Sequence, residues 1–300
     1  MGRAGHLMLS LNPGATRPES AHEVRAHIHD DVILERYRYP PGPAGTVSSH
    51  SHEEYQLCLC FGSASRYRYR GGWTVVPPGT LSVMMPGEVH TASEVEDRQE
   101  LTQYRVLYAG PDQLREVASA LGNRPSGLPS FADAVLHDDD LSKRFLRLHV
   151  ASEGASGQLG RDICLLSMLG ALVRRHAHTP CAPESVSGPR RAVQLARAYL
   201  EDNHAANVSL LELEQVADLS PFHLARLFQQ EVGMPPHAYQ IQVRIGHAKR
   251  LLLRGLPVSR VASETGFFDL SHFTRHFKRL VGGAPGRYAG NRKNVHYGAR

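Results

Sequence analysis

The stretch HLARLFQQEVGMPPHAY at residues 223–239 decides the fold, because HFTRHFKRLVGGAPGRY at residues 272–288 repeats it 49 positions later. Seven of the 17 aligned positions are identical, namely His, Arg, Phe, Val, Gly, Pro and Tyr. A repeat of this kind indicates that one supersecondary unit is duplicated. The last third of the chain is therefore predicted to contain two copies of the same small unit.

The first copy carries the signals of two short helices across a tight turn. Ser209 with Glu212 three residues later forms a capping box, and Asp218-Leu-Ser220 ends that helix. Ser220 is expected to cap a second helix that begins at Pro221 and ends at Gly233. This layout predicts a helix-turn-helix, whose second helix can enter the major groove of DNA.

The second copy repeats this layout. A helix opens at Pro257, the turn Gly266-Phe-Phe-Asp269 follows, and a capped helix runs over 270–281 to Gly282. Residues 236–254 between the copies are predicted to form one long helix. Such a strut would hold the two recognition helices at a fixed separation, which for successive major grooves is about 34 Å.

Positive charge gathers in the same region. Residues 190–300 carry 16 Lys and Arg against 8 Asp and Glu, a net charge of +8, whereas residues 1–189 carry 18 against 21, a net charge of −3. A basic domain favours a polyanion partner, because bound phosphates release their counterions. The cations that support this interpretation are Arg226, Arg275, Lys278 and Arg279 by the recognition helices and Arg244, Lys249, Arg250 and Arg254 on the strut. The alternative is a helical bundle that packs on another surface.

Length and composition exclude several classes of protein. A chain of 300 residues, 41% of them apolar and 21% charged, can build two or three cores and is not generally disordered. It has no run of about 18 apolar residues and no signal-peptide core near the N-terminus, so a cytoplasmic protein without a membrane partner is expected. Four cysteines without a CxxC pair indicate no disulfide framework.

The N-terminal third has the pattern of strands. Apolar residues alternate at period two over 32–39, 55–61 and 66–70, and Pro and Gly separate these runs. Short strands at such spacing predict a small antiparallel barrel or sandwich. After Pro111 the period becomes helical, over 111–121, 141–150 and 158–175.

The last of these helices carries an apolar stripe: Leu159, Ile163, Leu166, Leu169 and Val173. Such a stripe is more often core than partner surface. Our hypothesis is shared use, in which part of it forms the interface of a homodimer.

The expected fold class is α+β in two domains, an N-terminal cupin-like antiparallel β-barrel with helices and a C-terminal all-α double helix-turn-helix. The expected boundaries are 1–125 for the effector-sensing domain, 126–178 for a helical region used in dimerisation, 179–189 for a Pro-rich linker and 190–300 for the DNA-binding domain.

The block 266–279 followed by Pro285-Gly-Arg-Tyr288 closely resembles the C-terminal signature of the bacterial AraC-family transcription regulators. Residues 209–233 resemble that family's first helix-turn-helix, so the resemblance covers roughly 190–292. It implies a DNA-binding unit with two helix-turn-helices joined to an effector-sensing domain.

Carried over onto this sequence, the resemblance implies DNA contacts from Phe222, Ala225, Arg226, Leu270, Ser271, Thr274, Arg275 and Lys278. Phe222 and Leu270 offer only apolar contacts, for example to a thymine methyl group. Hydrogen-bonded base reading would therefore rest on Arg226 and Arg275. His223, His272, Phe228 and Phe277 are assigned to packing.

A second constellation consists of His50-Ser-His52, then Gln56, then Pro86-Gly-Glu-Val-His90. Histidines at i and i+2 on a strand project to the same side, and a third from a later strand could converge with them. The arrangement resembles a cupin barrel over about residues 30–108, except that Gln56 stands where cupin enzymes usually have glutamate. We expect His50, His52, Gln56 and His90 to bind an effector without a cofactor. A divalent metal at His50, His52 and His90 is the alternative.

Together these features predict a sequence-specific DNA-binding transcription regulator that responds to a small-molecule effector and is not an enzyme. Its expected partners are double-stranded DNA, the effector, a second copy of the chain and, for an activator, RNA polymerase. The alternative is a metal-dependent cupin enzyme fused to a DNA-binding domain. A constitutive architectural DNA protein is a third possibility. The sequence leaves open the effector, the target genes and the choice between activation and repression.

Overall fold

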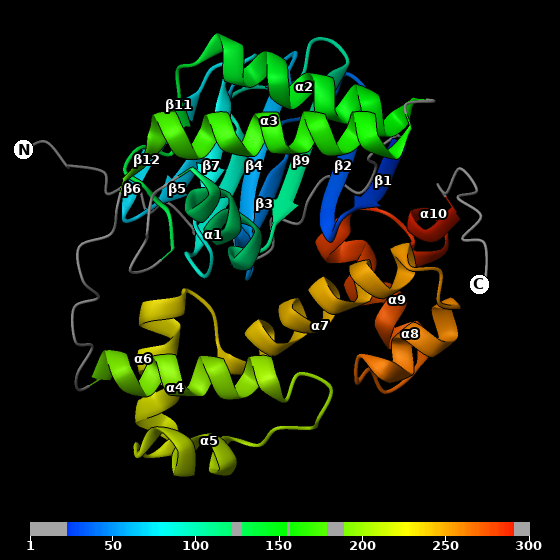
Figure 1. The fold of residues 1–300 in the computed structure, drawn as a ribbon. Helices are drawn as coiled ribbons and strands as arrows, with labels where there is room; N and C mark the ends of the chain where they lie inside the picture. Colours follow the sequence, from blue (N-terminus) through cyan, green and yellow to red (C-terminus); the bar gives the residue numbers. More distant parts are fainter. Residues whose placement is uncertain (1–22, 122–127, 155–156, 179–188, 291–300) are drawn as a thin grey trace, which may run out of the picture.

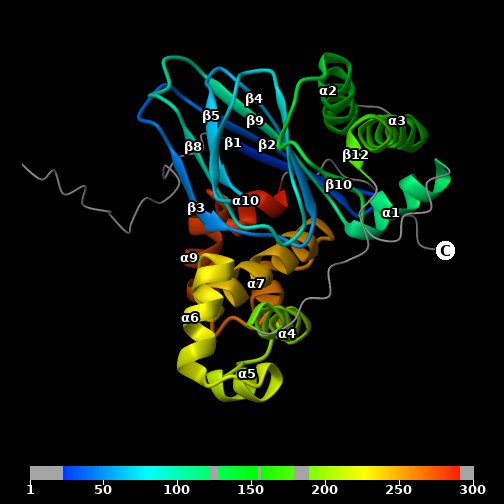
Figure 2. The ribbon, with the colours of Figure 1, turned by 90° about the vertical axis from the view of Figure 1, so that its left-hand side faces the viewer.

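The computed structural model describes residues 23–121, 128–154, 157–178 and 189–290 (Figure 1). Antiparallel strands form the N-terminal part, and a separate group of helices lies beside them (Figures 1 and 2). This confirms the predicted α+β class with two domains. The expected linker at 179–189 lies, apart from Pro189, outside the described residues.

The strands form two main sheets. The six-stranded sheet has the order β1-β2-β9-β4-β7-β11 and the four-stranded sheet the order β3-β8-β5-β6. Their bounds are β1 Glu23–His29, β2 Val32–Tyr39, β3 Thr46–His50, β4 Tyr55–Phe61, β5 Ser65–Tyr69, β6 Gly72–Val76, β7 Leu81–Met84, β8 His90–Glu94, β9 Thr102–Ala109 and β11 Val135–Leu136. Two further strands, β10 Ser130–Phe131 and β12 Ala177–His178, pair with each other. The period-two runs of the sequence thus mark β2, β4 and β5 within a residue.

Alternation along the strands gives the six-stranded sheet two different apolar faces. On β4, Leu57 and Leu59 belong to the core on its outer face, whereas Cys58 belongs to the core on the other face. The outer face is covered by α1 (Pro111–Ala120), α2 (Asp139–Glu153) and α3 (Gln158–His176). Because β11 pairs with β7, the segment after α1 is built into the same unit as the barrel.

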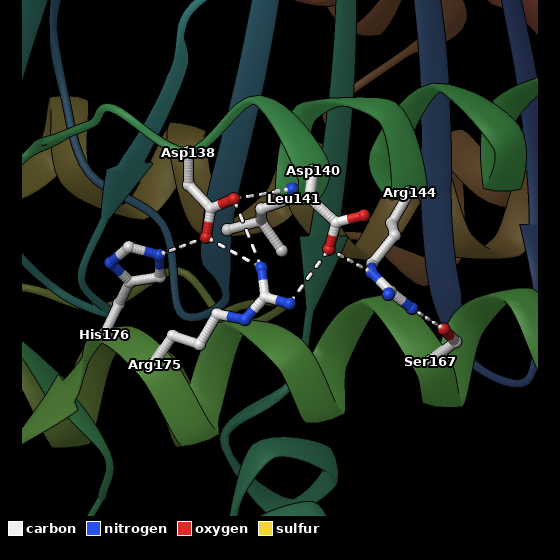
Figure 3. Close-up of polar contacts among 7 residues, drawn as sticks. All are labelled: Asp138, Asp140, Leu141, Arg144, Ser167, Arg175 and His176. Carbon is white, nitrogen blue, oxygen red and sulfur yellow. Dashed lines mark hydrogen bonds and ion pairs between the residues drawn. The ribbon is translucent and has the colours of Figure 1, made fainter.

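A polar cluster fastens α2 to α3 (Figure 3). Asp138 caps α2 by accepting from the Leu141 N–H at 2.9 Å, and it also accepts from Arg175 Nη1 at 3.1 Å and His176 Nε2 at 2.9 Å. Arg175 continues to Asp140, which it contacts at 2.9 Å. Burial alone would raise the pKa of Asp138, but the Leu141, His176 and Arg175 hydrogen bonds outweigh it and lower the pKa to about 2.

Replacing Asp138 by Ala is expected to cost about 1–2 kcal/mol of unfolding free energy at pH 7, chiefly through the lost N-cap. Since the pKa of Asp138 is lowered, its contribution is present above about pH 4 and disappears as the pH falls through about 2. Urea unfolding at several pH values measures both effects. Asp139→Ala is the matched control, because Asp139 is exposed and not the cap. Equal losses for the two variants would contradict this role.

The C-terminal helices follow the predicted layout closely. They are α4 Pro189–Asp202, α5 Leu210–Ala217, α6 Pro221–Val232, α7 Pro236–Leu253, α8 Val258–Glu264, α9 Leu270–Val281 and α10 Pro285–Gly290. The Ser209–Glu212 capping box and the Asp269 cap are present, and Gly233 and Gly282 end α6 and α9 in the left-handed conformation. The side chain of Ser220 makes no capping hydrogen bond, so the predicted cap at α6 is wrong in that detail.

The two helix-turn-helices have different surroundings. The first, α5–α6, packs with α4 and the start of α7 in a core that contains Leu213, Leu224 and Phe228. The second, α8–α9, shares its core with the barrel: Phe273, Phe277 and Tyr288 belong to one cluster with Tyr37 and Val106. Helix α7 connects the two units (Figure 1). The second helix-turn-helix is therefore packed directly on the β domain, and α7 connects the first helix-turn-helix to it.

The apolar stripe of α3 divides between two faces. Leu169 and Val173 are buried in the described structure, whereas Leu159, Ile163 and Leu166 are 71%, 59% and 62% exposed. The part of the stripe nearer the N-terminus of α3 is therefore an apolar surface that the described residues leave uncovered.

Candidate nucleic-acid interface and effector cavity

The side chains expected to touch DNA lie on α6 and along α9. Arg226, Ser271, Arg275 and Lys278 are exposed, and Leu270 is 46% exposed. Ala225 and Thr274 are half-buried, and the Phe222 side chain is not among those described. Phe268, which precedes α9 and is 93% exposed, was not among the predicted contacts. Both recognition helices thus present their candidate contacts to solvent.

The packing assignments hold for the two phenylalanines and fail for one histidine. Phe228 and Phe277 are fully buried. His272 is half-buried with its ring 5.5 Å from that of Phe267. His223 is exposed, so its assignment to packing is wrong.

The strut cations do not form the DNA-binding surface that their charge suggested. Arg244 is buried and donates to the carbonyls of His204 and Ala206 at 2.7 and 2.9 Å. Lys249, Arg250 and Arg254 instead reach the β domain, where they pair with Glu35, Glu54 and Asp31 in that order. Three positive charges that sequence analysis credited to DNA binding therefore join the two domains.

Glu35 is the centre of this interface. Its carboxylate is fully buried, with Lys249 Nζ 2.8 Å from Oε1. The hydroxyls of Tyr288 on α10 and Tyr37 on β2 donate to it at 2.6 and 2.5 Å. Burial by itself raises the pKa of Glu35, but Lys249 and the two hydroxyls outweigh it, so the pKa lies below its ordinary value. A buried ion pair with three donors thus links β2, α7 and α10.

Glu35 was not among the predicted site residues, although the sequence carries a signal for it. In the run Val32–Tyr39, Glu35 shares its strand face with Ile33 and Tyr37, which are both buried. An acidic residue on an apolar strand face requires a buried partner. The identity of that partner, more than 200 residues away, could not be read from the pattern.

Two of the cavities formed by the described residues adjoin the histidines. The first lies between the two sheets, encloses about 660 Å³ of empty space with its open mouth included, and is lined by His50, Gln56 and His90 among others. The second, about 820 Å³ on the same measure, lies between the β domain and α7 and includes His52. The cavities share Tyr37, Val47, His50 and Tyr108. The structure thus brings the four predicted effector residues to one region but divides them between adjoining cavities.

Three aromatic side chains of the β domain have different positions relative to the first cavity. Tyr67 lines the first cavity. Tyr55 is buried on the outer face of the sheet, and Trp73 is 58% exposed on β6. Tyr55 and Trp73 are therefore not part of the wall of the first cavity.

The three histidines have one tautomer in common. Their Nδ1 atoms lie 2.8, 2.6 and 3.1 Å from the carbonyl oxygens of Ser48, Glu54 and Glu88, for His50, His52 and His90 respectively. A carbonyl only accepts, so each Nδ1 carries the proton and Nε2 is an acceptor while the ring is neutral. Burial lowers the pKa of His90 well below its ordinary value, and it lowers that of His52 as well. Both rings are therefore neutral at pH 7.

The rings of the three histidines lie close together. The ring centroids are 4.2 Å apart for His50 and His90, 5.0 Å for His52 and His90, and 6.2 Å for His50 and His52. Within the described part of the chain, no three His, Cys, Asp or Glu side chains are placed so that they could hold a metal. No metal chemistry is assigned to the cluster.

The end of the first recognition helix touches the rim of the β domain. Gly233 ends α6 with φ +74°, and a Cβ there would lie 2.9 Å from Val89 Cγ1 and 3.1 Å from Ser49 Oγ. Arg279, Leu280 and Val281 at the end of α9 line the interdomain cavity. Both recognition helices therefore end at the face of the β domain that holds the histidines.

Comparison with known families agrees with this architecture. Residues 39–169 match the family described as AraC-like ligand binding domain, and residues 213–291 match a helix-turn-helix domain family. The chain belongs to the AraC family of transcription regulators. The two matched segments correspond to the β domain with its covering helices and to the two recognition units with their strut.

Relatives extend over both domains of this AraC-family chain. An uncharacterised helix-turn-helix transcriptional regulator of Bacillus subtilis, YbfI, is 28% identical over 248 residues, covering 82% of this chain and 86% of its own. The arabinose operon regulatory protein of Escherichia coli is 26% identical over 220 residues, covering 71% and 73%. Among solved structures, apo ToxT from Vibrio cholerae aligns with a TM-score of 0.60 at 10% identity, covering 88% of this chain and 98% of ToxT. The last match shows a shared fold.

Proposed function

We propose that this AraC-family regulator binds DNA through α6 and α9 and that a small molecule in the cavity between the sheets controls that binding. The observation that carries the proposal is the position of both recognition helices. They expose Arg226 and Arg275 to solvent, while their C-terminal ends lie against the β domain beside the cavity. Phe222, Ala225, Leu270, Ser271, Thr274 and Lys278 complete the proposed DNA contacts.

Side chains that line both cavities connect the effector cavity to the interface between the domains. Tyr37 and Tyr108 line both cavities, Tyr37 donates to Glu35, and the Lys249 ammonium lies 4.0 Å from the centre of the Tyr108 ring. A ligand that moves either tyrosine changes the environment of the Glu35–Lys249 pair. Differential binding to two domain arrangements is what such a ligand needs in order to shift their populations.

Selection of bound sequences from random duplexes by the full chain tests the proposal. We expect enrichment of a defined sequence and a steep loss of affinity between 50 and 200 mM salt, as is typical of proteins that contact phosphates. Repeating the selection with pools of metabolites tests the effector response. Binding without sequence preference, unchanged by any pool, would support the architectural alternative instead.

We propose no enzyme activity and no resident metal, so that the histidines act as neutral hydrogen-bonding groups. The curated relatives quoted above are named as regulators, which supports this choice. The competing cupin enzyme requires a metal. Elemental analysis of the purified chain distinguishes the two, because a stoichiometric transition metal that disappears in the His50→Ala and His90→Ala variants would contradict the proposal.

A homodimer is part of the proposal, with Leu159, Ile163 and Leu166 of α3 as its interface. An exposed apolar stripe on a helix is typical of a surface that a partner covers. Replacing Ile163 and Leu166 together by Glu is expected to convert a dimer into a monomer in sedimentation experiments without unfolding it. Replacing Val75 and Val95 together by Glu is the matched control, because these side chains are also exposed, at 56% and 44%. A wild-type chain that is already monomeric at high micromolar concentration would contradict the dimer.

Location and the remaining partner follow from the family. None of the helices in the described part of the chain combines the length and hydropathy that crossing a bilayer requires. A regulator of transcription acts where promoter DNA is, so we propose a cytoplasmic location. Two relatives are named as activators, one from Rhodococcus and one from Klebsiella pneumoniae, which supports RNA polymerase as a partner.

A further inference from the structure

We propose that the cavity between the sheets selects a small molecule that bears no negative charge and presents O–H or N–H donors. This inference names the effector's chemical class and rests on the function proposed above. Three properties of the cavity wall carry it, namely its charge, its hydrogen-bonding capacity and its aromatic rings.

The wall offers no cation to an anionic ligand. Neither Lys nor Arg occurs among the described residues that line this cavity, and the one ionisable carboxylate there is Glu94. Glu94 is buried and fully engaged, by Arg98 behind the wall, by the Gly45 N–H at 2.7 Å and by the Tyr104 hydroxyl at 2.9 Å. A carboxylate or phosphate ligand would lose its hydration beside another carboxylate, which is unfavourable.

Two hydrogen-bond acceptors on the wall face the cavity, His90 Nε2 at one end of β8 and the Tyr104 hydroxyl oxygen beside Glu94 at the other. His90 is 1% exposed, its Nδ1–H is held by the Glu88 carbonyl, and its Nε2 has no hydrogen-bond partner. The Tyr104 hydroxyl gives its proton to Glu94, so toward a ligand its oxygen can only accept. A buried acceptor without a donor is costly, and a ligand that supplies the donor removes that cost. A ligand that donates a hydrogen bond to His90 Nε2 is therefore favoured.

Aromatic rings supply the remaining selectivity. Five tyrosines line the cavity: Tyr37, Tyr39, Tyr67, Tyr104 and Tyr108. The face of such a ring is electronegative, so it attracts an uncharged ring, a polarised C–H or a cation and repels an anion. Charge and stacking therefore favour the same class of ligand.

The cations of the adjoining interdomain cavity do not alter this conclusion. Lys249 is paired with Glu35 at 2.8 Å, and Arg279 donates to His276 Nδ1 at 2.9 Å. One structural neighbour is ToxT bound to an unsaturated fatty acid, which is 11% identical to this chain. The fold is shared with that protein, whereas the wall described here predicts that a fatty-acid carboxylate is excluded from the cavity between the sheets.

A charge-balanced fragment library tests the proposal on the full chain. It contains neutral, cationic and anionic members of equal size, with benzyl alcohol, benzylamine and benzoate as one matched set, and binding is read by ligand-observed NMR. Ala92→Phe fills the cavity, since Ala92 lines it, and Val75→Phe on the exposed face of β6 is the control. Hits that survive Val75→Phe and vanish with Ala92→Phe are expected to be neutral or cationic donors.

His90→Phe is expected to weaken those hits by about tenfold, the typical consequence of leaving a ligand donor unpaired. It also replaces Ala92→Phe should that variant not fold. Nitrogen-15 NMR of the wild-type histidines is expected to show the Nδ1–H tautomer for His90, and the Nε2–H tautomer would overturn the proposal. Cavity-dependent anionic hits would overturn it as well. A library without any cavity-dependent hit would instead overturn the effector site itself, so the two failures are distinguishable.

Discussion

Lys249→Met is expected to remove about 3–5 kcal/mol of stability, because it leaves the Glu35 carboxylate buried without its cation. Glu35 is fully buried and Lys249 is 12% exposed in the pair, and methionine keeps most of the lysine stem. Urea unfolding of the full chain measures the loss. Water reaches Glu35 once the domains separate, so the variant should also favour an arrangement with separated domains. Small-angle scattering measures that separation.

Arg254→Met is the matched control for this variant. Arg254 directly follows α7 and also crosses the interface, but the two side chains of its pair with Asp31 are 54% and 75% exposed. Exposed pairs contribute about 0–1 kcal/mol, so only a small loss is expected. Adding Glu35→Gln to Lys249→Met should restore much of the lost stability, because it removes the unpaired charge. Equal losses for Lys249→Met and Arg254→Met would contradict the central role of Glu35.

The pH dependence of Lys249→Met should have the opposite sign to that of the wild type. In the wild type the pKa of Glu35 is lowered, so its contribution is present above about pH 4.5 and is lost as the pH falls through the folded value. In the variant, burial without the cation raises the pKa of Glu35. The variant should therefore gain stability as the pH falls from 7 toward 5, and denaturation midpoints across that range test the sign.

Arg275→Ala is expected to weaken specific DNA binding by about 1–3 kcal/mol, roughly 5- to 150-fold, which is the usual contribution of a guanidinium that reads a base. Arg275 is exposed on α9, so the fold should stay intact. Titration of a selected duplex by fluorescence anisotropy measures the loss. The variant should also tolerate more bases at one position of the site.

Arg260→Ala provides the control for charge alone. Arg260 lies on α8 of the same helix-turn-helix, is 67% exposed and pairs with Glu264 within its own helix. It removes one positive charge without touching the recognition helix, so we expect a smaller loss that is equal for all sequences. An operator affinity unchanged by Arg275→Ala, or matched by Arg260→Ala, would count against the assigned contact.

The helices and their ends were predictable because their signals are local. The Ser209–Glu212 box, the Asp269 cap and the glycines at 233 and 282 act within one turn of the residues that they specify. The 49-residue repeat then assigned these helices to two like units. The same reasoning found β2 and β4, whose alternation reflects neighbours on the same strand.

Features that depend on distant contacts were not predictable in the same way. Lys249 and Arg254 resemble DNA-binding cations in sequence, and their carboxylate partners lie on β2 and the turn before it. The α3 stripe likewise has one period, yet Leu169 is buried and Leu166 is exposed, because the sheet covers only one side of the helix. Packing between α3 and the sheet decides which side of α3 is buried, and the local sequence pattern does not predict that packing.

Hydroxyl-radical footprinting of the full chain on its selected duplex tests the central claim most directly. The claim is that α6 and α9, joined by α7, read consecutive major grooves on one side of the DNA. The predicted result is two protected segments for each protomer, separated by about one helical turn. One of the two segments is expected to disappear in Arg226→Ala or in Arg275→Ala. Protection of a single groove for each protomer, unaffected by one of these variants, would contradict the account.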